Sequence, residues 1–366
     1  METMLFDYCL PREMIAQEPL ENRDDSRLMV IDRLEGVIRH LRFGDLPSLL
    51  NPGDCLVLNT SRVFPGRIAT RKALTGGSVE LLLLESLPDC TWSAITRGAV
   101  VRAGTVLVVE EAGLSGEVTR VTGPGRVLVR FTAPGGPFGV TEQLRMAGQV
   151  PLPPYIHRVP RDPERYQTVY SQRENSAAAP TAGLHFTRQL MEEVEARGAG
   201  FARLELAVGT DTFLPVREEQ AEDHPMHSEW FSLGAECAGR VNSCQGSVIA
   251  VGTTSARALE SAAAGPVEAS GSGAPGDYRV SPVSGRTSLY ILPGYRFRVV
   301  DALLTNFHLP RSTLLMMVCA FGGYDLVMDA YREAVAEGYR FYSFGDAMLL
   351  TRQLPGSRAG QTGADQ

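Results

Sequence analysis

The stretch G-S-V-I-A-V-G-T-T-S-A-R-A-L-E at residues 246–260 decides the fold class. It joins an apolar strand pattern, a Gly-Thr-Thr-Ser turn and a helical pattern. Residues 299–321 repeat this order, with a strand to about 305 and a helix capped near Ser312. Residues 177–199 place a polar turn before another helix, with Thr187 as its expected N-cap. Strands that alternate with helices indicate a sheet with parallel strands and covering helices.

Residues 65–149 show a different pattern. Short β-rich runs such as V-E-L-L-L-L-E-S follow one another, separated by Gly, Pro and Asp turns. Five or six strands at this spacing are typical of a small barrel or sandwich. We therefore predict an α/β fold: a mixed α/β domain of residues 1–64 and 150–354, with parallel strand–turn–helix units, interrupted by an inserted small β-barrel. We expect a mobile loop at 262–286 and a disordered tail at 355–366.

The composition limits the class of protein. The 366 residues are 44 % hydrophobic and 21 % charged, which suits a soluble core. The net charge of −7 argues against a nucleic-acid partner, which usually leaves a basic footprint. The six cysteines form no C-x-x-C pair, and neither a signal peptide nor an apolar run of membrane length is visible. We expect a cytoplasmic monomer that does not contact a membrane.

Three polar turns carry reactive side chains. They are residues 180–187 with His185, residues 252–255, and residues 306–310 with His308. Ligands of open α/β sheets bind beyond the carboxyl ends of the strands, and helix N-termini hold carboxylates or phosphates. Helix capping alone also explains Ser, Thr and Asn at such turns. The pattern alone leaves both interpretations open.

Other common motifs are missing from the sequence. It contains no G-x-x-x-x-G-K, no G-x-G-x-x-G after a strand and no G-x-S-x-G. His224 and His227 lie close to three carboxylates, but Pro225 breaks the helix that an H-E-x-x-H metal site needs. We predict no metal here, and expect a loop held by histidine–carboxylate hydrogen bonds.

Residues 155–173 are the best local candidate for contact with a polyanion. Arginines alternate there with tyrosines, a combination that binds phosphates and stacks on bases. The residues are Tyr155, Arg158, Arg161, Arg165, Tyr166, Tyr170 and Arg173. A solvated surface remains the alternative, because Asp162 and Glu164 dilute the positive charge.

Longer motifs point to a known family. They include I-A-Q-E-P-L-E-N-R-D-D-S-R-L at 15–28, P-L-P-P-Y-I-H-R at 151–158, A-A-P-T-A-G-L-H-F-T at 178–187, H-P-M-H-S-E-W at 224–230 and T-N-F-H-L-P-R-S-T-L-L-M at 305–316. From about residue 5 to 351 the chain resembles the S-adenosylmethionine:tRNA ribosyltransferase-isomerases of queuosine biosynthesis. The family fold, an α/β domain interrupted by a β-barrel, agrees with the prediction above.

The resemblance implies an unusual reaction. Family members transfer the ribosyl part of S-adenosylmethionine to 7-aminomethyl-7-deazaguanine at the tRNA wobble position. The products are epoxyqueuosine in tRNA, adenine and methionine. S-adenosylmethionine is then a consumed co-substrate, so we expect no cofactor and no metal, and the tRNA anticodon arm is the expected partner.

The resemblance also assigns roles to residues. A base must deprotonate the ribose carbon beside the sulfonium, and an acid must protonate the leaving adenine, so His185 and His308 are the candidate catalytic residues. The candidates for substrate binding are Asn59, Arg62, Thr181, Gly183, Thr253, Thr254, Ser255, Arg257 and Asn306. The candidates for tRNA binding are Tyr155, Arg158, Arg161, Arg165 and Arg173.

The chain departs from the family pattern at four positions. Thr60 and Ser288 stand where aspartate is usual, Ala207 where histidine is usual, and Asp211 where glycine is usual. Each change alters a polar group near a turn. Two alternatives therefore stay open: a paralogue that uses S-adenosylmethionine on a non-tRNA acceptor, and a catalytically weak RNA-binding paralogue.

Overall fold

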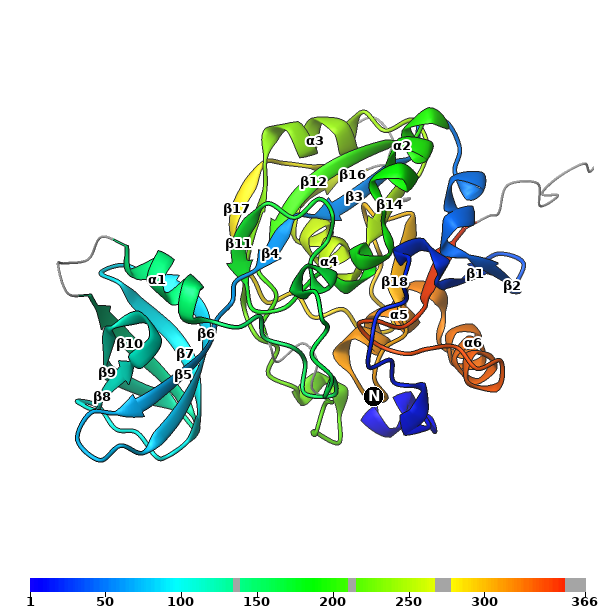
Figure 1. Cartoon of the computed structure of the whole chain (residues 1–366). Helices are drawn as coiled ribbons and strands as arrows, with labels where there is room; N and C mark the ends of the chain where they lie inside the picture. The colour runs from blue at the N-terminus through cyan, green and yellow to red at the C-terminus, as the bar shows by residue number, and fades with distance from the viewer. Residues whose placement is uncertain (134–138, 210–214, 267–277, 353–366) are drawn as a thin grey trace, which may run out of the picture.

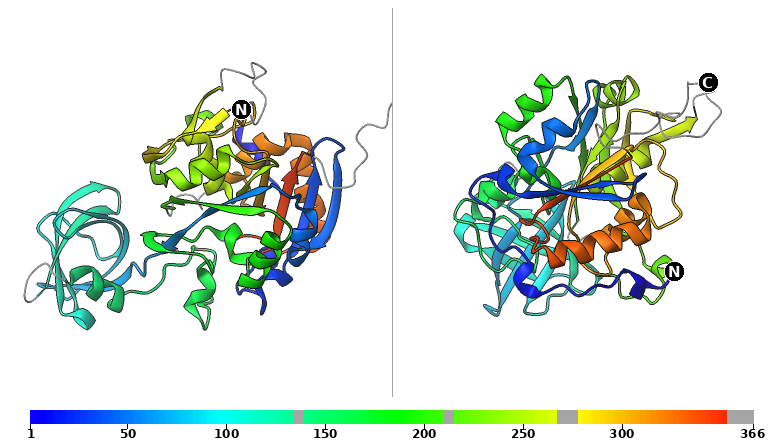
Figure 2. Two further views of the ribbon diagram at one scale, coloured as in Figure 1. Left: turned by 90° about the horizontal axis from the view of Figure 1, so that it is seen from above. Right: turned by 90° about the vertical axis from the view of Figure 1, so that its right-hand side faces the viewer.

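The computed structural model describes residues 1–133, 139–209, 215–266 and 278–352. Figures 1 and 2 show a β-barrel beside a larger α/β body. The body contains a nine-stranded sheet in the order β17-β13-β12-β3-β14-β18-β19-β1-β2. Its strands are β1 (Arg27–Asp32), β2 (Val37–Arg42), β3 (Cys55–Asn59), β12 (Gly200–Leu206), β13 (Glu229–Leu233), β14 (Val248–Val251), β17 (Val283–Thr287), β18 (Ala302–Asn306) and β19 (Ala347–Thr351).

Four neighbouring strands of this sheet run in the same direction. β12, β3, β14 and β18 pair in parallel, whereas β19 is antiparallel to β18. The carboxyl ends of the four strands therefore meet at one edge of the sheet. In folds of this kind, ligands bind beyond that edge.

Alternating apolar residues explain how the sheet is covered on both faces. In β3, Cys55 and Val57 belong to one core, and Leu56 and Leu58 belong to the other. Because successive strand side chains point to opposite faces, an apolar run of this kind is buried on both sides. The helices of the body are α2 (Arg188–Ala196), α3 (Ala235–Asn242), α4 (Thr253–Ala262), α5 (Thr313–Gly322) and α6 (Tyr324–Ala336).

Two helices begin at the predicted caps. The hydroxyl oxygens of Thr187 before α2 and Ser312 before α5 each accept the backbone N–H three residues later, at 3.1 and 3.2 Å. No single helix of the described residues is long and apolar enough to cross a membrane. Within the described ranges one pair of helices, α5 and α6, has that length and composition when taken together, and the pair is bent by 118° at the junction.

The barrel is a closed sheet in the order β10-β7-β6-β5-β8-β9. Its inward residues alternate with exposed ones, as with the buried Ile68 and Thr70 of β5. The helix α1 (Val140–Ala147) follows, and its Val140 and Leu144 join the barrel core. The strands are β5 (Arg67–Lys72), β6 (Ser78–Leu87), β7 (Thr91–Gly98), β8 (Val106–Val109), β9 (Leu114–Gly123) and β10 (Arg126–Thr132). The predicted mixed α/β fold with an inserted β-barrel is confirmed.

The prediction of one loop at 262–286 is wrong for the described part of that stretch. β15 (Ala263–Pro266) pairs with β16 (Tyr278–Val280), and β17 pairs with β13 at the border of the main sheet. Composition alone does not reveal these strands, since their pairing partners lie elsewhere in the chain. Residues 267–277 and the predicted tail at 355–366 lie outside the described residues.

Candidate active site

The end of β3 is tied to its neighbours by Asn59. Its side-chain oxygen accepts the N–H groups of Leu206 and Ser61, both at 3.1 Å, and its amide donates to the Leu206 carbonyl oxygen at 3.0 Å. The same amide lies 3.4 Å from Oγ1 of Thr254 at the start of α4. Asn59 therefore joins the ends of β3 and β12 to the first turn of α4.

The three polar turns singled out in the sequence converge at this edge. Nδ2 of Asn306, the last residue of β18, lies 3.1 Å from Nε2 of His185 in the 3₁₀ helix η7 (Thr181–His185). A Cβ atom on Gly252, which follows β14 with φ +92°, would lie 3.6 Å from Cβ of Ala182 in η7. The turn at 180–187 does not follow a strand of the main sheet; η7 instead packs against its edge.

His185 is buried and has a hydrogen-bond partner at each ring nitrogen. Nδ1 lies 2.7 Å from Oγ of Ser26, and Nε2 faces Asn306. The ring stacks on Phe43, with 4.8 Å between ring centroids. Burial, followed by the charges of Arg340 and Arg23, lowers the pKa of His185 from 6.5 to about 3. The imidazole is therefore neutral at pH 7.

His308 lies two residues beyond Asn306 in the turn after β18. Its Nε2 is 2.9 Å from Oγ1 of Thr305, and its backbone N–H donates to the hydroxyl of Tyr331 at 3.0 Å. The hydroxyl of Tyr8 donates to its carbonyl oxygen. Burial lowers the pKa of His308 to about 3. The side chain is a neutral imidazole that lines a cavity described below.

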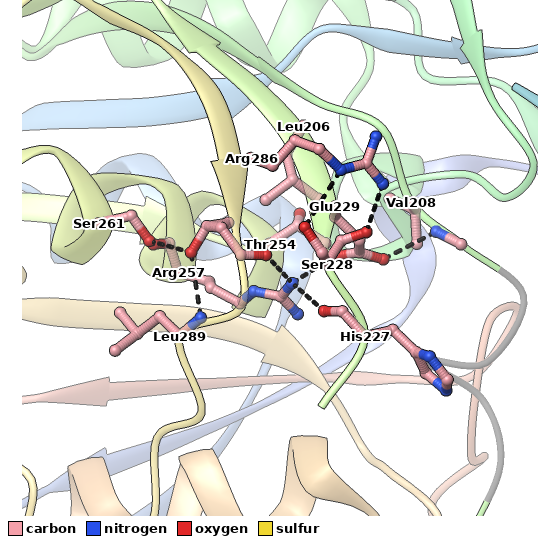
Figure 3. A network of polar contacts seen from close by, with 12 residues as sticks. Leu206, Val208, His227, Ser228, Glu229, Thr254, Arg257, Ser261, Arg286 and Leu289 are labelled. Atoms are coloured by element: carbon pink, nitrogen blue, oxygen red, sulfur yellow. Dashed lines mark hydrogen bonds and ion pairs between the residues drawn. The ribbon is translucent and has the colours of Figure 1, made fainter. Parts of the chain in front are cut away.

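A buried ion pair lies between α4 and the start of β13 (Figure 3). Nη2 of Arg257 is 3.1 Å from Oε2 of Glu229, and the two side chains are only 5 % and 7 % exposed. Glu229 also accepts the N–H of Gly209 through Oε1 at 2.7 Å. Burial lowers the pKa of Arg257, and Glu229 opposes that shift. From the sequence, Glu229 is expected only as one of the carboxylates near His224 and His227, and not as a partner of Arg257.

Three cavities follow one another along the edge. The large cavity, about 560 Å³, lies between the barrel and the body and is lined by Trp92, Arg126, Arg173, Ala207, Glu229 and Arg286, among others. The middle cavity, about 10 Å³, includes Glu229, Thr253, Thr254, Arg257 and Leu314. The Asn306 cavity, about 20 Å³, includes Thr181, Asn306, His308, Leu314, Tyr342 and Ser343.

Shared wall residues place these cavities in series. Glu229 lines both the large and the middle cavity, and Leu314 lines both the middle and the Asn306 cavity. The large cavity has room for a drug-sized ligand, whereas the other two each hold about one water-sized group. The row therefore combines one spacious site with two small polar hollows.

Some predicted binding residues are engaged within the protein. The hydroxyl of Ser255 is buried and donates to the Val251 carbonyl oxygen at 2.8 Å. Arg62 is paired with Glu164 and Glu174. Gly183 is required by packing, because a Cβ atom there would lie 2.0 Å from the hydroxyl oxygen of Tyr170.

The expected tyrosine–arginine surface at 155–173 needs correction. Tyr166 and Tyr170 are buried in the core, so their rings cannot stack on bases as the sequence interpretation assumed. The hydroxyl of Tyr155 is hydrogen-bonded to Ser343 at 2.7 Å. The alternation of aromatic and basic residues placed the rings inside and the charged groups outside.

The four arginines of the same stretch differ in the solvent accessibility of their side chains. Arg165 donates to the carbonyl oxygens of Leu20 and Glu21 at 2.6 and 2.8 Å. Arg158 and Arg161 are exposed, and Arg173 is 68 % exposed and lines the large cavity. Three of the four guanidinium groups are therefore accessible to a ligand.

The departures from the family pattern have different surroundings. Thr60 is buried and donates to the Leu204 carbonyl oxygen at 3.1 Å. Ala207 lines the large cavity, and Ser288 is exposed. Asp211 lies outside the described residues. Only Ala207 of the three described positions borders one of the three cavities.

The loop around His224 contains the expected type of hydrogen bond. Nδ1 of His224 lies 2.9 Å from Oε2 of Glu218. Within the described ranges, no three His, Cys, Asp or Glu side chains gather into a group that could hold a metal ion.

Comparison with known proteins agrees with this architecture. A family model described as "Queuosine biosynthesis protein" matches residues 3–350. S-adenosylmethionine:tRNA ribosyltransferase-isomerases from Symbiobacterium thermophilum and Anaeromyxobacter sp. are 48 % and 49 % identical, and the matches cover 94 % and 95 % of this chain and 98 % of each relative.

A solved structure is also similar. The crystal structure of S-adenosylmethionine tRNA ribosyltransferase from Thermotoga maritima has 37 % sequence identity and a TM-score of 0.52, and the match covers 94 % of this chain and 99 % of that one. The chain belongs to the family of S-adenosylmethionine:tRNA ribosyltransferase-isomerases, the queuosine biosynthesis proteins.

Proposed function

We propose that this chain is an S-adenosylmethionine:tRNA ribosyltransferase-isomerase. It transfers and isomerises the ribosyl part of S-adenosylmethionine onto 7-aminomethyl-7-deazaguanine at the tRNA wobble position, with release of adenine and methionine. The observation that carries this conclusion is the near full-length identity of 48 % to a relative of that name. The row of cavities at the carboxyl edge of the sheet supports it.

Single polar groups of the co-substrate fit the two small hollows at the edge. The N-terminus of α4, at Thr253 and Thr254, presents backbone N–H groups to the middle cavity and suits the methionine carboxylate. Thr181 and Asn306 line the next cavity, where a ribose hydroxyl or one polar edge group of adenine can bind. This placement keeps the reacting ribose beside His308.

The large cavity suits the acceptor base. A base that is modified by an enzyme must leave its stack and enter a pocket. The aromatic rings of Trp92 and Trp230 offer stacking surface, and the exposed guanidinium of Arg173 offers a phosphate contact. Glu229 lines both this cavity and the middle one, so the acceptor base would lie next to the methionine part of the co-substrate.

His308 is our candidate for both proton transfers. A neutral imidazole can take the proton from the ribose carbon beside the sulfonium and then give it to the departing adenine. The aminomethyl nitrogen of the acceptor then attacks the ribose-derived fragment, and closure of the epoxide expels methionine. His185 was the second candidate, but its hydrogen bonds suit a different role, which is argued below.

We further propose a cytoplasmic monomer that needs neither a cofactor nor a metal and binds the anticodon arm. The reaction supports the absence of a cofactor, because the sulfonium of S-adenosylmethionine is itself the activated group.

The test uses S-adenosylmethionine and tRNA that carries 7-aminomethyl-7-deazaguanine. We expect release of adenine and methionine in equal amounts, and a wobble nucleoside with the mass of epoxyqueuosine. Matched reactions contain tRNA with guanine at the wobble position, or no tRNA with the free base. Release with the free base alone would favour a small-molecule acceptor. The structural reason to test this alternative is Ala207, which stands where histidine is usual and lines the large cavity. Binding of the donor without any release would favour the RNA-binding paralogue.

A further inference from the structure

The side-chain amide of Asn306 has a defined orientation. Its Nδ2 lies 3.0 Å from the carbonyl oxygen of Tyr342 and 3.1 Å from Nε2 of His185. A carbonyl oxygen only accepts hydrogen bonds, so the amide nitrogen, and not the amide oxygen, faces Tyr342. One N–H of the amide then serves Tyr342 and the other serves His185.

This orientation fixes the tautomer of His185. Because Nε2 accepts the hydrogen bond from Asn306, the single ring proton lies on Nδ1. Nδ1 then donates to Oγ of Ser26 at 2.7 Å. Stacking on Phe43 holds the plane of the ring. Both ring nitrogens and one ring face are therefore engaged in keeping His185 in place.

The remaining polar atom of Asn306 is its side-chain oxygen. Oδ1 is buried and has no hydrogen-bond partner among the described residues, although Asn306 is only 2 % exposed. A buried acceptor without a partner is unfavourable, so such atoms usually have a function or bind a further molecule. Asn306 lines the cavity of about 20 Å³, which has room for about one polar group.

We propose that His185 is a positioning residue that presents the Oδ1 acceptor of Asn306 to a hydroxyl or amino group of S-adenosylmethionine. The inference rests on the proposed function and deepens it. Since Oδ1 only accepts, the group that it binds must carry a hydrogen. The 2′- and 3′-hydroxyls and the adenine 6-amino group of the co-substrate all meet this requirement. His185 then affects the reaction through Asn306 and carries no proton.

Two substitutions of His185 separate positioning from proton transfer. The side-chain oxygen of glutamine in His185→Gln can replace Nε2 as the acceptor for Asn306 but cannot carry a proton at neutral pH. His185→Leu removes the acceptor. The matched control is His40→Leu, because His40 also has partners at both ring nitrogens but lies on β2, away from the three cavities.

The readouts are the Kd of S-adenosylhomocysteine, measured by calorimetry, and kcat and KM from adenine release. We expect His185→Gln to keep Kd and kcat within about threefold of the wild type, with an unchanged pH profile. His185→Leu and Asn306→Leu should each weaken binding about tenfold, as expected for one lost buried hydrogen bond. The double variant should bind no more weakly than Asn306→Leu, since both changes remove the same contact.

Analogues of S-adenosylhomocysteine identify the donor group. The Kd of analogues that lack the 2′-hydroxyl, the 3′-hydroxyl or the 6-amino group is measured for the wild type and for Asn306→Leu. The analogue without the relevant group should lose affinity for the wild type but bind Asn306→Leu as well as the parent compound does. Equal losses in both proteins for all three analogues would overturn the proposed contact.

Proton transfer by His185 would give a different result. His185→Gln and His185→Leu would then both lose turnover at least about 100-fold while binding S-adenosylhomocysteine like the wild type, and the positioning role would be wrong. If His185→Leu does not fold, His185→Gln and the analogues still distinguish a positioning role from proton transfer. If the wild type binds S-adenosylhomocysteine but releases no adenine from S-adenosylmethionine, the proposed reaction is wrong, and the binding measurements still test the Asn306 contact. If the wild type binds no S-adenosylhomocysteine, both the proposed reaction and the proposed contact are wrong.

Discussion

At the scale of single residues, the ion pair of Arg257 and Glu229 places two opposite charges inside the sheet edge that carries the candidate site. Both side chains are almost completely buried, and the carboxylate also accepts a backbone N–H from Gly209. Removal of one partner leaves a buried charge without compensation. We expect Arg257→Met to lower the free energy of unfolding by about 3–5 kcal/mol, as measured by urea denaturation.

The control for this prediction removes both charges. In Arg257→Met/Glu229→Gln no isolated charge remains, so a large part of the loss should be recovered. Additive losses from the two single substitutions would show that the two side chains act independently. The sequence interpretation expected Arg257 to contact a phosphate or carboxylate of a ligand; here its carboxylate partner is Glu229.

The low pKa of His308 makes stability depend on pH. Its pKa is about 3 in the folded chain, against an ordinary value of 6.5. Between these values the unfolded chain binds a proton that the folded chain does not, so this stabilisation is full above about pH 6.5 and is lost as the pH falls toward 3. The slope is about 1.4 kcal/mol per pH unit.

The comparison of wild type with His308→Gln isolates this effect, because His185 contributes equally to both proteins. We expect the wild type to lose about 2 kcal/mol more than the variant when urea denaturation is moved from pH 7 to pH 5. Equal losses in the two proteins would mean that His308 titrates normally in the folded state.

At the scale of secondary structure elements, Glu260 of α4 positions the chain that leads into β18. Its buried carboxylate accepts the N–H groups of Arg298, Val299 and Val300 at 2.9–3.1 Å, and the hydroxyl of Tyr295 at 3.1 Å. Since β18 ends at Asn306, this contact helps to place the candidate site. Burial raises the pKa of Glu260, and the four donors oppose that shift.

Replacement of this acceptor should be costly. In Glu260→Gln an amide NH₂ group faces backbone donors, and at least one of them loses its partner. We expect a loss of about 3 kcal/mol in the free energy of unfolding and weaker binding of S-adenosylhomocysteine. Glu236→Gln, at an exposed pair with Arg240, is the matched control and should change stability by less than about 0.5 kcal/mol. Equal effects of the two substitutions would contradict the proposed anchoring of β18.

The elements that the sequence predicted well are those with local signals. Thr187 and Ser312 cap their helices within one turn of the chain, and the continuous apolar run of β14 indicates a buried strand. Pairings between distant segments were not predictable in this way. β17 pairs with β13, from which it is separated by about 50 residues of sequence, and Glu229 forms an ion pair with Arg257 on a different element. Aromatic rings such as Tyr166 are ambiguous for the same reason, because their burial depends on what packs above them.

At the scale of the whole molecule, the barrel and the body are joined across the large cavity by a polar contact. Arg286 of β17 pairs with Glu85 of β6 at 2.9 Å, and it also donates to the Ser228 carbonyl oxygen at 2.8 Å. The two parts differ in charge. Residues 65–149 carry nine basic and seven acidic side chains, so the acidic excess of the chain lies outside the barrel segment. A polyanion should therefore approach on the side of the large cavity.

This distribution predicts tRNA binding that depends on salt in spite of the net charge of −7. With about three phosphate contacts, the affinity should fall at least about tenfold between 50 and 200 mM salt. Arg173→Ala removes an exposed guanidinium at the large cavity, so it should weaken binding and reduce the slope of log K against log salt by about one. Arg332→Ala, on α6 at the opposite side of the body from the barrel (Figure 1), should leave both unchanged. An affinity that does not change with salt, or the same loss in both variants, would show that the large cavity is not where the phosphates dock.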